Sequence, residues 1–316
     1  MGLEYEIMET KMQKKDFSSL GLRMLIGAVL ITVVQLISQS AVLGNRPEWS
    51  DNMNIVLSVT MIPLYVIGYP LTFLIMKKRD ADRIERHKMG IGRFILAFMM
   101  AYGLMIAGNI IGLALTAGIG LVKGEPVNNA LLTVVTEGNV WISAIYTVLL
   151  APVFEEILFR KLICDRVVQY GQRTAILISG LMFGLFHMNF NQFFYAAFLG
   201  GFFAFIYVKT GRLKYTIGLH MTVNFFGSVI GGLLLQNVDP AQMAGMAIYG
   251  VYSMCVYGIG ITGIVLLFIN WSKLKTVEGR IVIEKGSWLK TAILNPGMLL
   301  YCAVMMAVMI VQAFVM

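Results

Sequence analysis

Long apolar runs separated by short polar segments dominate the chain. A helix that crosses the hydrocarbon core of a bilayer needs about 20 mostly apolar residues, and most of these runs reach that length. The pattern therefore predicts an all-α, polytopic membrane bundle of about eight or nine transmembrane helices. We expect them near residues 21–43, 54–76, 94–122, 138–160, 174–188, 193–208, 216–236, 246–270 and 293–315.

The fifth and sixth runs are short, and a polar segment, MNFNQ (188–192), separates them. Polar backbone at membrane depth is tolerated only where protein or a water-filled cavity covers it, so we expect a wet pocket near the fifth helix. Two polar segments elsewhere suggest local structure. The loop at 77–88 could form a short surface helix, and the alternation in TVEGRIVIEKGSW (276–288) predicts a small cytoplasmic hairpin.

Basic residues indicate the orientation in the membrane. The chain has 25 Lys and Arg against 17 Asp and Glu, a formal charge of +8. With a cytoplasmic N-terminus, all the basic residues except Arg46 and Lys123 fall on the inner side, as the positive-inside rule requires. The basic excess then reflects topology, with some attraction to anionic inner-leaflet lipid. We expect a multi-pass protein of the cell membrane that has the lipid bilayer, and no nucleic acid, as its partner.

Composition agrees with this class. The chain is 58% apolar and 13% charged, whereas a soluble domain is about 45–50% apolar and about 25% charged. Soluble, disordered and disulfide-framework classes are therefore excluded. The three cysteines, Cys164, Cys255 and Cys302, show no spacing typical of a metal knuckle or of paired disulfides. The first residues lack the apolar region of a signal peptide.

The chain is expected to have four parts. These are a cytoplasmic tail (1–20), N-terminal transmembrane helices (21–122), a central helical core (131–235), and C-terminal transmembrane helices (246–316) with a cytoplasmic loop at 271–292. Small residues at four-residue spacing predict close helix packing. They stand at Gly108 and Gly112, Gly180 and Gly184, and Gly227 and Gly231.

Ionisable side chains inside a membrane are costly and indicate function. Glu155 and Glu156 are the only acids that we expect to be buried, because Asp165 falls in the loop predicted after the fourth helix. Of the three histidines, His187 and His220 lie within apolar runs. The candidate chemistry is therefore confined to three predicted helices.

Three pairs on these helices are spaced i, i+4, which places the members of each pair on one face. They are Glu156 and Arg160, Phe183 and His187, and His220 and Asn224. Each pair alone could be an interfacial ion pair or a hydrogen bond between helices. Together with Glu155, which lies about 100° around its helix from Glu156, they predict one shared site.

A buried carboxylate beside a histidine can deprotonate a water molecule that attacks a peptide carbonyl. An imidazole N–H and an asparagine amide can then stabilise the oxyanion. The chain has no G-x-S-x-G motif of a serine hydrolase and no H-E-x-x-H motif of a zincin. Glu155, His187 and His220 would also be a possible set of three zinc ligands that leaves one position open.

The three motifs resemble the CPBP family of intramembrane proteases, which comprises CAAX proteases and bacteriocin-processing enzymes and is also called Abi. The family pattern is E-E-x-x-x-R, F-x-x-x-H and H-x-x-x-N. It stands here, in the same order, as EEILFR (155–160), FGLFH (183–187) and HMTVN (220–224). The resemblance covers about residues 131–235 and marks this core as the catalytic part.

The resemblance implies a glutamate-dependent endopeptidase similar to CAAX prenyl protease 2. By analogy Glu155 activates water with His187, His220 and Asn224 support the oxyanion, and Glu156, Arg160 and Phe183 hold the site. The expected substrate is a membrane-associated peptide or protein, prenylated or not. We favour a mechanism without cofactor or metal, with zinc as the alternative, and leave the oligomeric state open.

Two other functions stay open on the same residues. The first is a catalytically silent membrane scaffold or regulator, and the second is a proton-coupled transporter. Depth presents a further question. Counted from the nearest basic residues, Glu155 and His220 lie about 8–9 Å inside the cytoplasmic boundary and His187 about 21 Å inside it. A tilted or broken fifth helix, or a cytoplasmic funnel, is expected to reconcile these depths.

Overall fold

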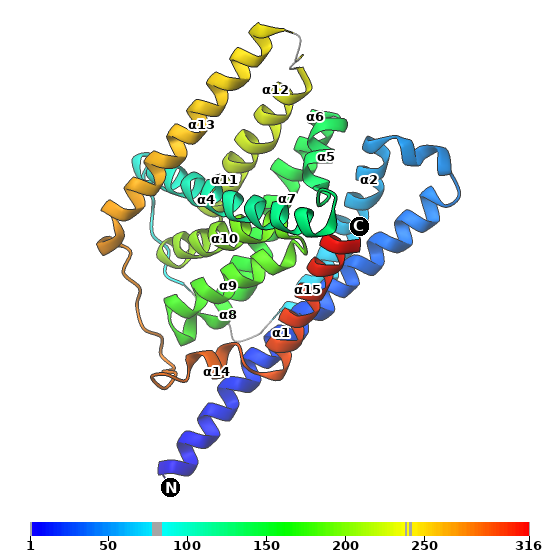
Figure 1. Ribbon diagram of the computed structural model, residues 1–316. Coiled ribbons are helices and arrows are strands. Elements are labelled where there is room, and N and C mark those ends of the chain that lie inside the picture. Colours follow the sequence, from blue (N-terminus) through cyan, green and yellow to red (C-terminus); the bar gives the residue numbers. More distant parts are fainter. Residues whose placement is uncertain (1, 78–83, 238, 240–241, 316) are drawn as a thin grey trace.

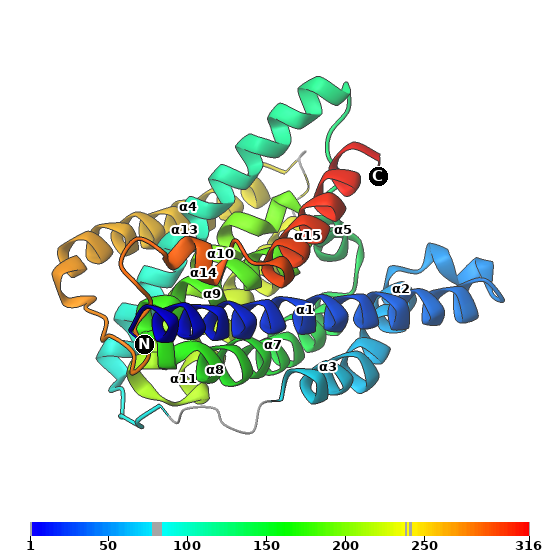
Figure 2. The same ribbon diagram turned by 90° about the horizontal axis from the view of Figure 1, so that it is seen from below.

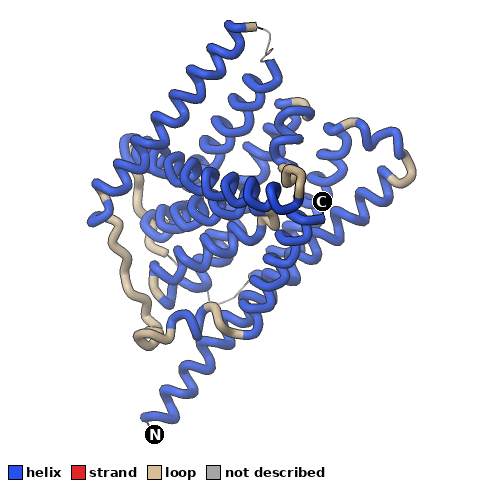
Figure 3. Tube along the Cα trace, viewed as in Figure 1, coloured by secondary structure: helices blue, strands red, loops and turns tan. Residues whose placement is uncertain are grey.

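The computed structural model describes residues 2–77, 84–237, 239 and 242–315, and within them the chain forms helices and no strand (Figure 3). The predicted all-α membrane bundle is confirmed. Eight helices in these ranges are long and apolar enough to span a bilayer, and a ninth apolar helix is only 15 residues long. The eight spans are Thr10–Leu43, Met53–Met76, Ile91–Lys123, Val140–Tyr170, Phe190–Thr210, Leu213–Asn237, Met243–Ile269 and Pro296–Val315.

Several spans consist of α-helical pieces joined by wider π-helical stretches. The α-helices are α1 (Gly2–Leu43), α2 (Met53–Pro63), α3 (Tyr69–Met76), α4 (Ile91–Lys123), α5 (Ala130–Glu137), α6 (Val140–Ala144), α7 (Ala151–Glu156), α8 (Asp165–Val167), α9 (Gln172–Phe186), α10 (Phe190–Thr210), α11 (Leu213–Asn224), α12 (Gly231–Asn237), α13 (Met243–Ile269), α14 (Trp288–Ala292) and α15 (Pro296–Val315). The π-helical stretches are η2 (Leu64–Gly68), η3 (Ile145–Leu150), η4 (Ile157–Cys164) and η6 (Phe225–Ile230).

Glycines allow α4 and α9 to pack closely against α10. A Cβ atom at Gly108 in α4 would overlap the backbone of Tyr195 in α10, and one at Gly180 or Gly184 in α9 would meet the backbone of α10. Close packing at these two spacings is confirmed. The same prediction is wrong at Gly227, where a Cβ would meet nothing within 4 Å, because this residue lies on an exposed face of η6.

The helices α1 and α15 lie side by side although they are far apart in sequence (Figures 1 and 2). Gly21 in α1 faces Gly297 in α15 so closely that a Cβ atom on either would overlap the opposing backbone. The Gly297 amide donates a hydrogen bond of 2.9 Å to the Ser18 hydroxyl. The charged segment 1–20 is continuous with the first membrane helix, since α1 runs unbroken from Gly2 to Leu43.

The fourth spanning helix extends further than its charges suggest. It continues through η4 and α8 to Tyr170, so the predicted end at Arg160 is wrong. Asp165 is only 2% exposed, and its predicted place in a polar loop is wrong as well. Tyr207 donates a 2.9 Å hydrogen bond to Asp165, and Lys161 forms an ion pair with it. Because these charges are partnered inside the bundle, they do not mark the end of a membrane span.

The predicted hairpin at 276–288 does not form. The segment instead lies along the junction between the fourth spanning helix and α9, where Gln172 donates its backbone N–H to the Val277 carbonyl at 3.0 Å and Ile281 donates to Gln169 at 2.9 Å. Its polar backbone is therefore satisfied by this junction instead of by a second strand. The surface helix suggested for 77–88 falls largely on residues 78–83, which lie outside the described residues, and 84–90 is irregular.

We predict that Asn45 lies outside the cell and that Lys285 lies in the cytoplasm, because the positive-inside rule places the basic loops on the inner side. Each residue would be replaced singly by cysteine in a chain whose three native cysteines are changed to alanine. A membrane-impermeant maleimide should label Asn45→Cys in intact cells and Lys285→Cys only after the membrane is opened. The opposite labelling pattern would show that the orientation is inverted.

Candidate active site

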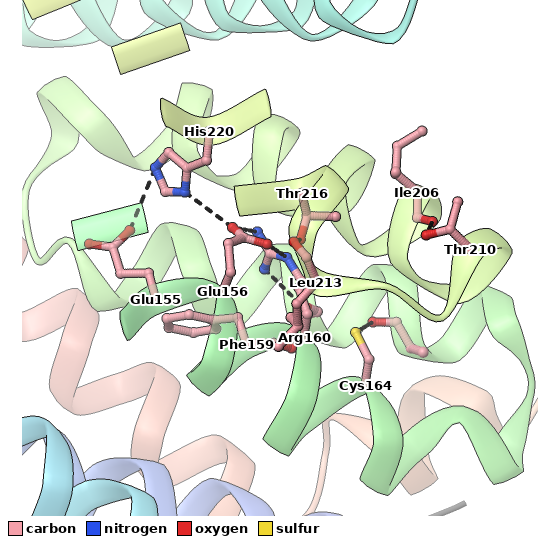
Figure 4. A network of polar contacts seen from close by, with 12 residues as sticks. Glu155, Glu156, Phe159, Arg160, Cys164, Ile206, Thr210, Leu213, Thr216 and His220 are labelled. Carbon is pink, nitrogen blue, oxygen red and sulfur yellow. Dashed lines mark hydrogen bonds and ion pairs between the residues drawn. The ribbon is translucent and has the colours of Figure 1, made fainter. Parts of the chain in front are cut away.

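A buried ion pair joins Glu156, the last residue of α7, to Arg160 in η4 (Figure 4). Neither side chain has any exposed surface. Arg160 Nε lies 2.8 Å from Glu156 Oε2, and its Nη2 donates a 2.9 Å hydrogen bond to Oε1. The i, i+4 spacing in the sequence predicted this pair. Because the pair is buried, removal of one partner costs much more stability than removal of one partner of a surface pair.

The guanidinium group of Arg160 connects three further elements. Its Nη1 donates a 3.0 Å hydrogen bond to the Ser179 hydroxyl in α9. Its central carbon lies 5.0 Å from the ring centre of Phe183 in α9 and 5.7 Å from that of Phe203 in α10. These distances are typical of cation–π contacts. The ion pair is therefore enclosed by aromatic rings from two neighbouring helices.

His220 in α11 lies between the two adjacent carboxylates (Figure 4). Its Nδ1 is 3.1 Å from Glu156 Oε1, and because a carboxylate can only accept, Nδ1 must be the donor. Its Nε2 lies 3.8 Å from Glu155 Oε2. The Glu155 side chain is 15% exposed, whereas that of Glu156 is fully buried. Glu155 is thus the carboxylate that a water molecule or a ligand can reach.

His187 lies at the end of α9, next to this group. Its Nδ1 is 2.8 Å from the Phe183 carbonyl oxygen, so Nδ1 donates and Nε2 is left for other partners. The Phe183 ring makes edge-to-face contacts with both histidine rings. The distance between ring centres is 4.9 Å for His187 and 5.8 Å for His220. His187 also interacts electrostatically with Glu155 and His220. The structure therefore brings all three sequence motifs together.

Asn224 occupies the edge of the group. It lies one helical turn after His220, and its side-chain amide donates a 2.8 Å hydrogen bond to the Thr147 carbonyl in η3. Among the described residues, no side-chain hydrogen bond or ion pair joins Asn224 to Glu155, His187 or His220. One of the two amide N–H groups is used by Thr147, which leaves the second for another acceptor.

The difference in depth between Glu155 and His187 becomes small once the fourth spanning helix is followed to its end. Glu155 lies 15 residues before Tyr170, and His187 lies 15 residues after Gln172. At 1.5 Å per residue both are about 22 Å from the same junction. Because Arg160 is buried and its helix continues beyond it, Arg160 is not the point from which the depth of Glu155 should be counted. The short helix α9 then turns back at residues 187–189 into α10.

Ser179 and Thr216 also belong to the site and were not predicted from the sequence. Ser179 precedes Phe183 by four residues and binds Arg160, while Thr216 precedes His220 by four residues and lies beside Glu156. Each residue stands four positions before a motif residue, on the same face of the same helix. Extending these two faces by one turn toward the N-terminus would have identified both residues. No comparable signal identified Phe203, because an aromatic residue in an apolar run is equally typical of a lipid-facing position.

No group of three or more His, Cys, Asp or Glu side chains within the described ranges is arranged to hold a metal ion. The alternative zinc site would be formed by Glu155, His187 and His220. His220 already uses Nδ1 toward Glu156, so only its Nε2 would be available to a metal. Metal dependence stays a prediction.

Residues 137–226 match the family described as Type II CAAX prenyl endopeptidase Rce1-like. This stretch, the Rce1-like segment, is similar to that family. All three motifs fall within it, so the resemblance seen in the sequence is confirmed. The Rce1-like segment comprises α6 to α11 with the intervening π-helical stretches and ends within η6.

One curated relative of the chain is "Putative membrane peptidase YdiL" of Bacillus subtilis (strain 168). It is 28% identical over 95 residues, which make up 30% of this chain and 36% of that protein. The chain thus matches about a third of the length of this relative. No solved structure gives a significant match to the chain.

We predict that Arg160→Met destabilises the protein by about 3–5 kcal/mol, because it leaves the Glu156 carboxylate buried without its cation. The double change Glu156→Gln with Arg160→Met should recover most of this loss. Thermal unfolding in detergent would measure both variants. Arg46→Met is the matched control, since the Arg46–Glu48 pair is more than half exposed and should contribute at most about 1 kcal/mol. A Tm equal to that of the wild type for Arg160→Met would contradict the structural role of the pair.

Proposed function

We propose that the chain is an intramembrane endopeptidase in which Glu155 activates the attacking water. The observation that carries the proposal is the position of Glu155, which is partly accessible and lies 3.8 Å from His220 Nε2, while the buried Glu156 binds the opposite nitrogen of the same ring. Two adjacent glutamates in different surroundings are suited to different roles. The match of this segment to the Rce1-like family supports the same reaction class.

In the proposed reaction Glu155 accepts a proton from water, and the water oxygen forms a bond to the carbonyl carbon of the peptide. The π electron pair of the carbonyl moves onto its oxygen, which becomes an oxyanion. When this intermediate collapses, the C–N bond breaks and the departing nitrogen takes up the proton held by Glu155. His187, through its free Nε2, would help to orient the water.

His220 and Asn224 would stabilise the oxyanion. His220 can donate from Nε2 only when both ring nitrogens carry protons, since Nδ1–H is already directed at Glu156. Asn224 would contribute the N–H that Thr147 does not use. Glu156 and Arg160 act as positioning residues in this scheme, because they hold the His220 ring and do not face the accessible side.

The substrate class proposed is a peptide or protein segment that reaches the site from the membrane or its surface. The family name supports a prenylated substrate, while bacteriocin-type leader peptides are the alternative. We propose the cell membrane as the location and a mechanism that uses no metal. Metal analysis of active protein after treatment with a chelator tests the last point, because a bound zinc ion required for turnover would overturn it.

We predict that Glu155→Gln abolishes peptide cleavage, with a fall in kcat of at least about 100-fold, because an amide cannot act as a general base. Purified protein would be tested with one peptide sequence in prenylated and unmodified form. Thermal unfolding should show that the variant is folded, and Glu48→Gln, an exposed glutamate in an ion pair, should cleave at the wild-type rate. Full activity of Glu155→Gln would remove Glu155 as the base.

The same proteins separate the two alternative functions. A silent scaffold would show no cleavage by the wild type with either peptide. A transporter would show proton-coupled flux in proteoliposomes that Glu155→Gln abolishes. Cleavage of the prenylated peptide alone would identify the substrate class.

A further inference from the structure

Tyr69 brings a residue from outside the Rce1-like segment to the candidate site. It is the first residue of α3 and is only 2% exposed. Its ring lies 5.4 Å from that of Phe154 and 6.3 Å from that of Phe186. Phe154 directly precedes Glu155, and Phe186 directly precedes His187. Tyr69 therefore packs against both chain segments that carry the proposed base and its partner.

Of three tyrosines near Glu155, Tyr65 and Tyr69 are buried and Tyr195 is partly buried, and Tyr69 differs from the other two. Tyr65 donates its hydroxyl to the Tyr146 carbonyl at 3.1 Å, and the Tyr195 hydroxyl accepts a 2.8 Å hydrogen bond from Gln192. The Tyr69 hydroxyl has no hydrogen-bond partner among the described residues. The hydroxyl oxygen is also not among the fully buried polar atoms that lack a partner, so it keeps some accessible surface and can accept a partner that arrives with the substrate.

The backbone around Tyr69 shares a feature with the rest of the site. The described chain contains four π-helical stretches, and each adjoins Tyr69 or an element that carries a candidate residue. Stretch η2 ends directly before Tyr69, η4 begins directly after Glu156, and η6 begins directly after Asn224. Stretch η3 directly precedes α7, which carries both glutamates. Because single π-helical turns are frequent at functional sites, this pattern groups Tyr69 with the candidate residues independently of its ring contacts.

We propose that Tyr69 is a further catalytic residue, whose hydroxyl donates a hydrogen bond to the carbonyl oxygen of the peptide bond under attack and to the oxyanion that it becomes. The hydroxyl keeps its proton throughout, so the bonds and protons of the reaction are those already described. The ring contacts with Phe154 and Phe186 place Tyr69 next to the residues that carry the proposed base and its partner. The inference rests on the proposed peptidase function.

A substitution that removes only the oxygen tests this role. In Tyr69→Phe the ring contacts with Phe154 and Phe186 are retained, so the thermal unfolding midpoint should stay close to that of the wild type. We expect kcat to fall by about 10- to 100-fold, because a donor to the oxyanion acts mainly in the transition state, with KM nearly unchanged. Tyr301→Phe in α15 is the matched control, since it removes a buried hydroxyl that donates to the Met182 carbonyl, outside the site, and it should keep the wild-type kcat.

The outcomes are distinct. A fall in kcat at constant KM for Tyr69→Phe, with Tyr301→Phe unaffected, supports the proposal. A wild-type kcat for Tyr69→Phe overturns it and leaves the peptidase function in place, as does a rise in KM alone. Equal losses in both tyrosine variants would show a general packing effect and would also overturn it. If the wild type cleaves no peptide, the proposed function fails and this inference fails with it.

Discussion

The pairing of Arg160 with Glu156 is the interaction on which the core of the molecule depends. Two charges without solvent access are costly unless partners inside the protein compensate them. The guanidinium group finds such partners in a carboxylate from its own helix, a hydroxyl from α9 and aromatic rings from α9 and α10. The carboxylate in turn holds the imidazole of α11. The ion pair thus connects the fourth spanning helix with α9, α10 and α11. It also determines which nitrogen of the His220 ring faces Glu155.

Helix faces could be predicted from the sequence because they depend only on local spacing. Pairs at i, i+4 identified Glu156 with Arg160, Phe183 with His187 and His220 with Asn224, and the structure brings these three faces to one place. The spacing contains no information on which nitrogen of a histidine meets which carboxylate. That detail depends on the angle at which α11 crosses the fourth spanning helix, and hence on packing between segments about 60 residues apart.

The wrong predictions for the end of the fourth helix and for Asp165 have a common physical origin. A charged residue is read as a membrane boundary because an isolated charge avoids hydrocarbon. Arg160 and Asp165 are buried all the same, because partners that are distant in sequence or one turn away neutralise them. The alternation of polar and apolar residues at 276–288 suggested a hairpin in which the segment pairs with itself. Its backbone partners lie instead more than 100 residues earlier in the chain. Tyr69 gave no signal, since a tyrosine in an apolar helix is ordinary until its neighbours in space are known.

The contact between α1 and α15 has a consequence for the order of events during biosynthesis. The Ser18 hydroxyl and the small surface at Gly21 meet their partners only on a helix that begins 275 residues later. Until α15 has been made, the small surface at Gly21 of α1 is therefore not covered by its partner. Insertion of α15 covers it, so the assembly of this bundle depends on a late docking step and does not proceed strictly from the first helix onward.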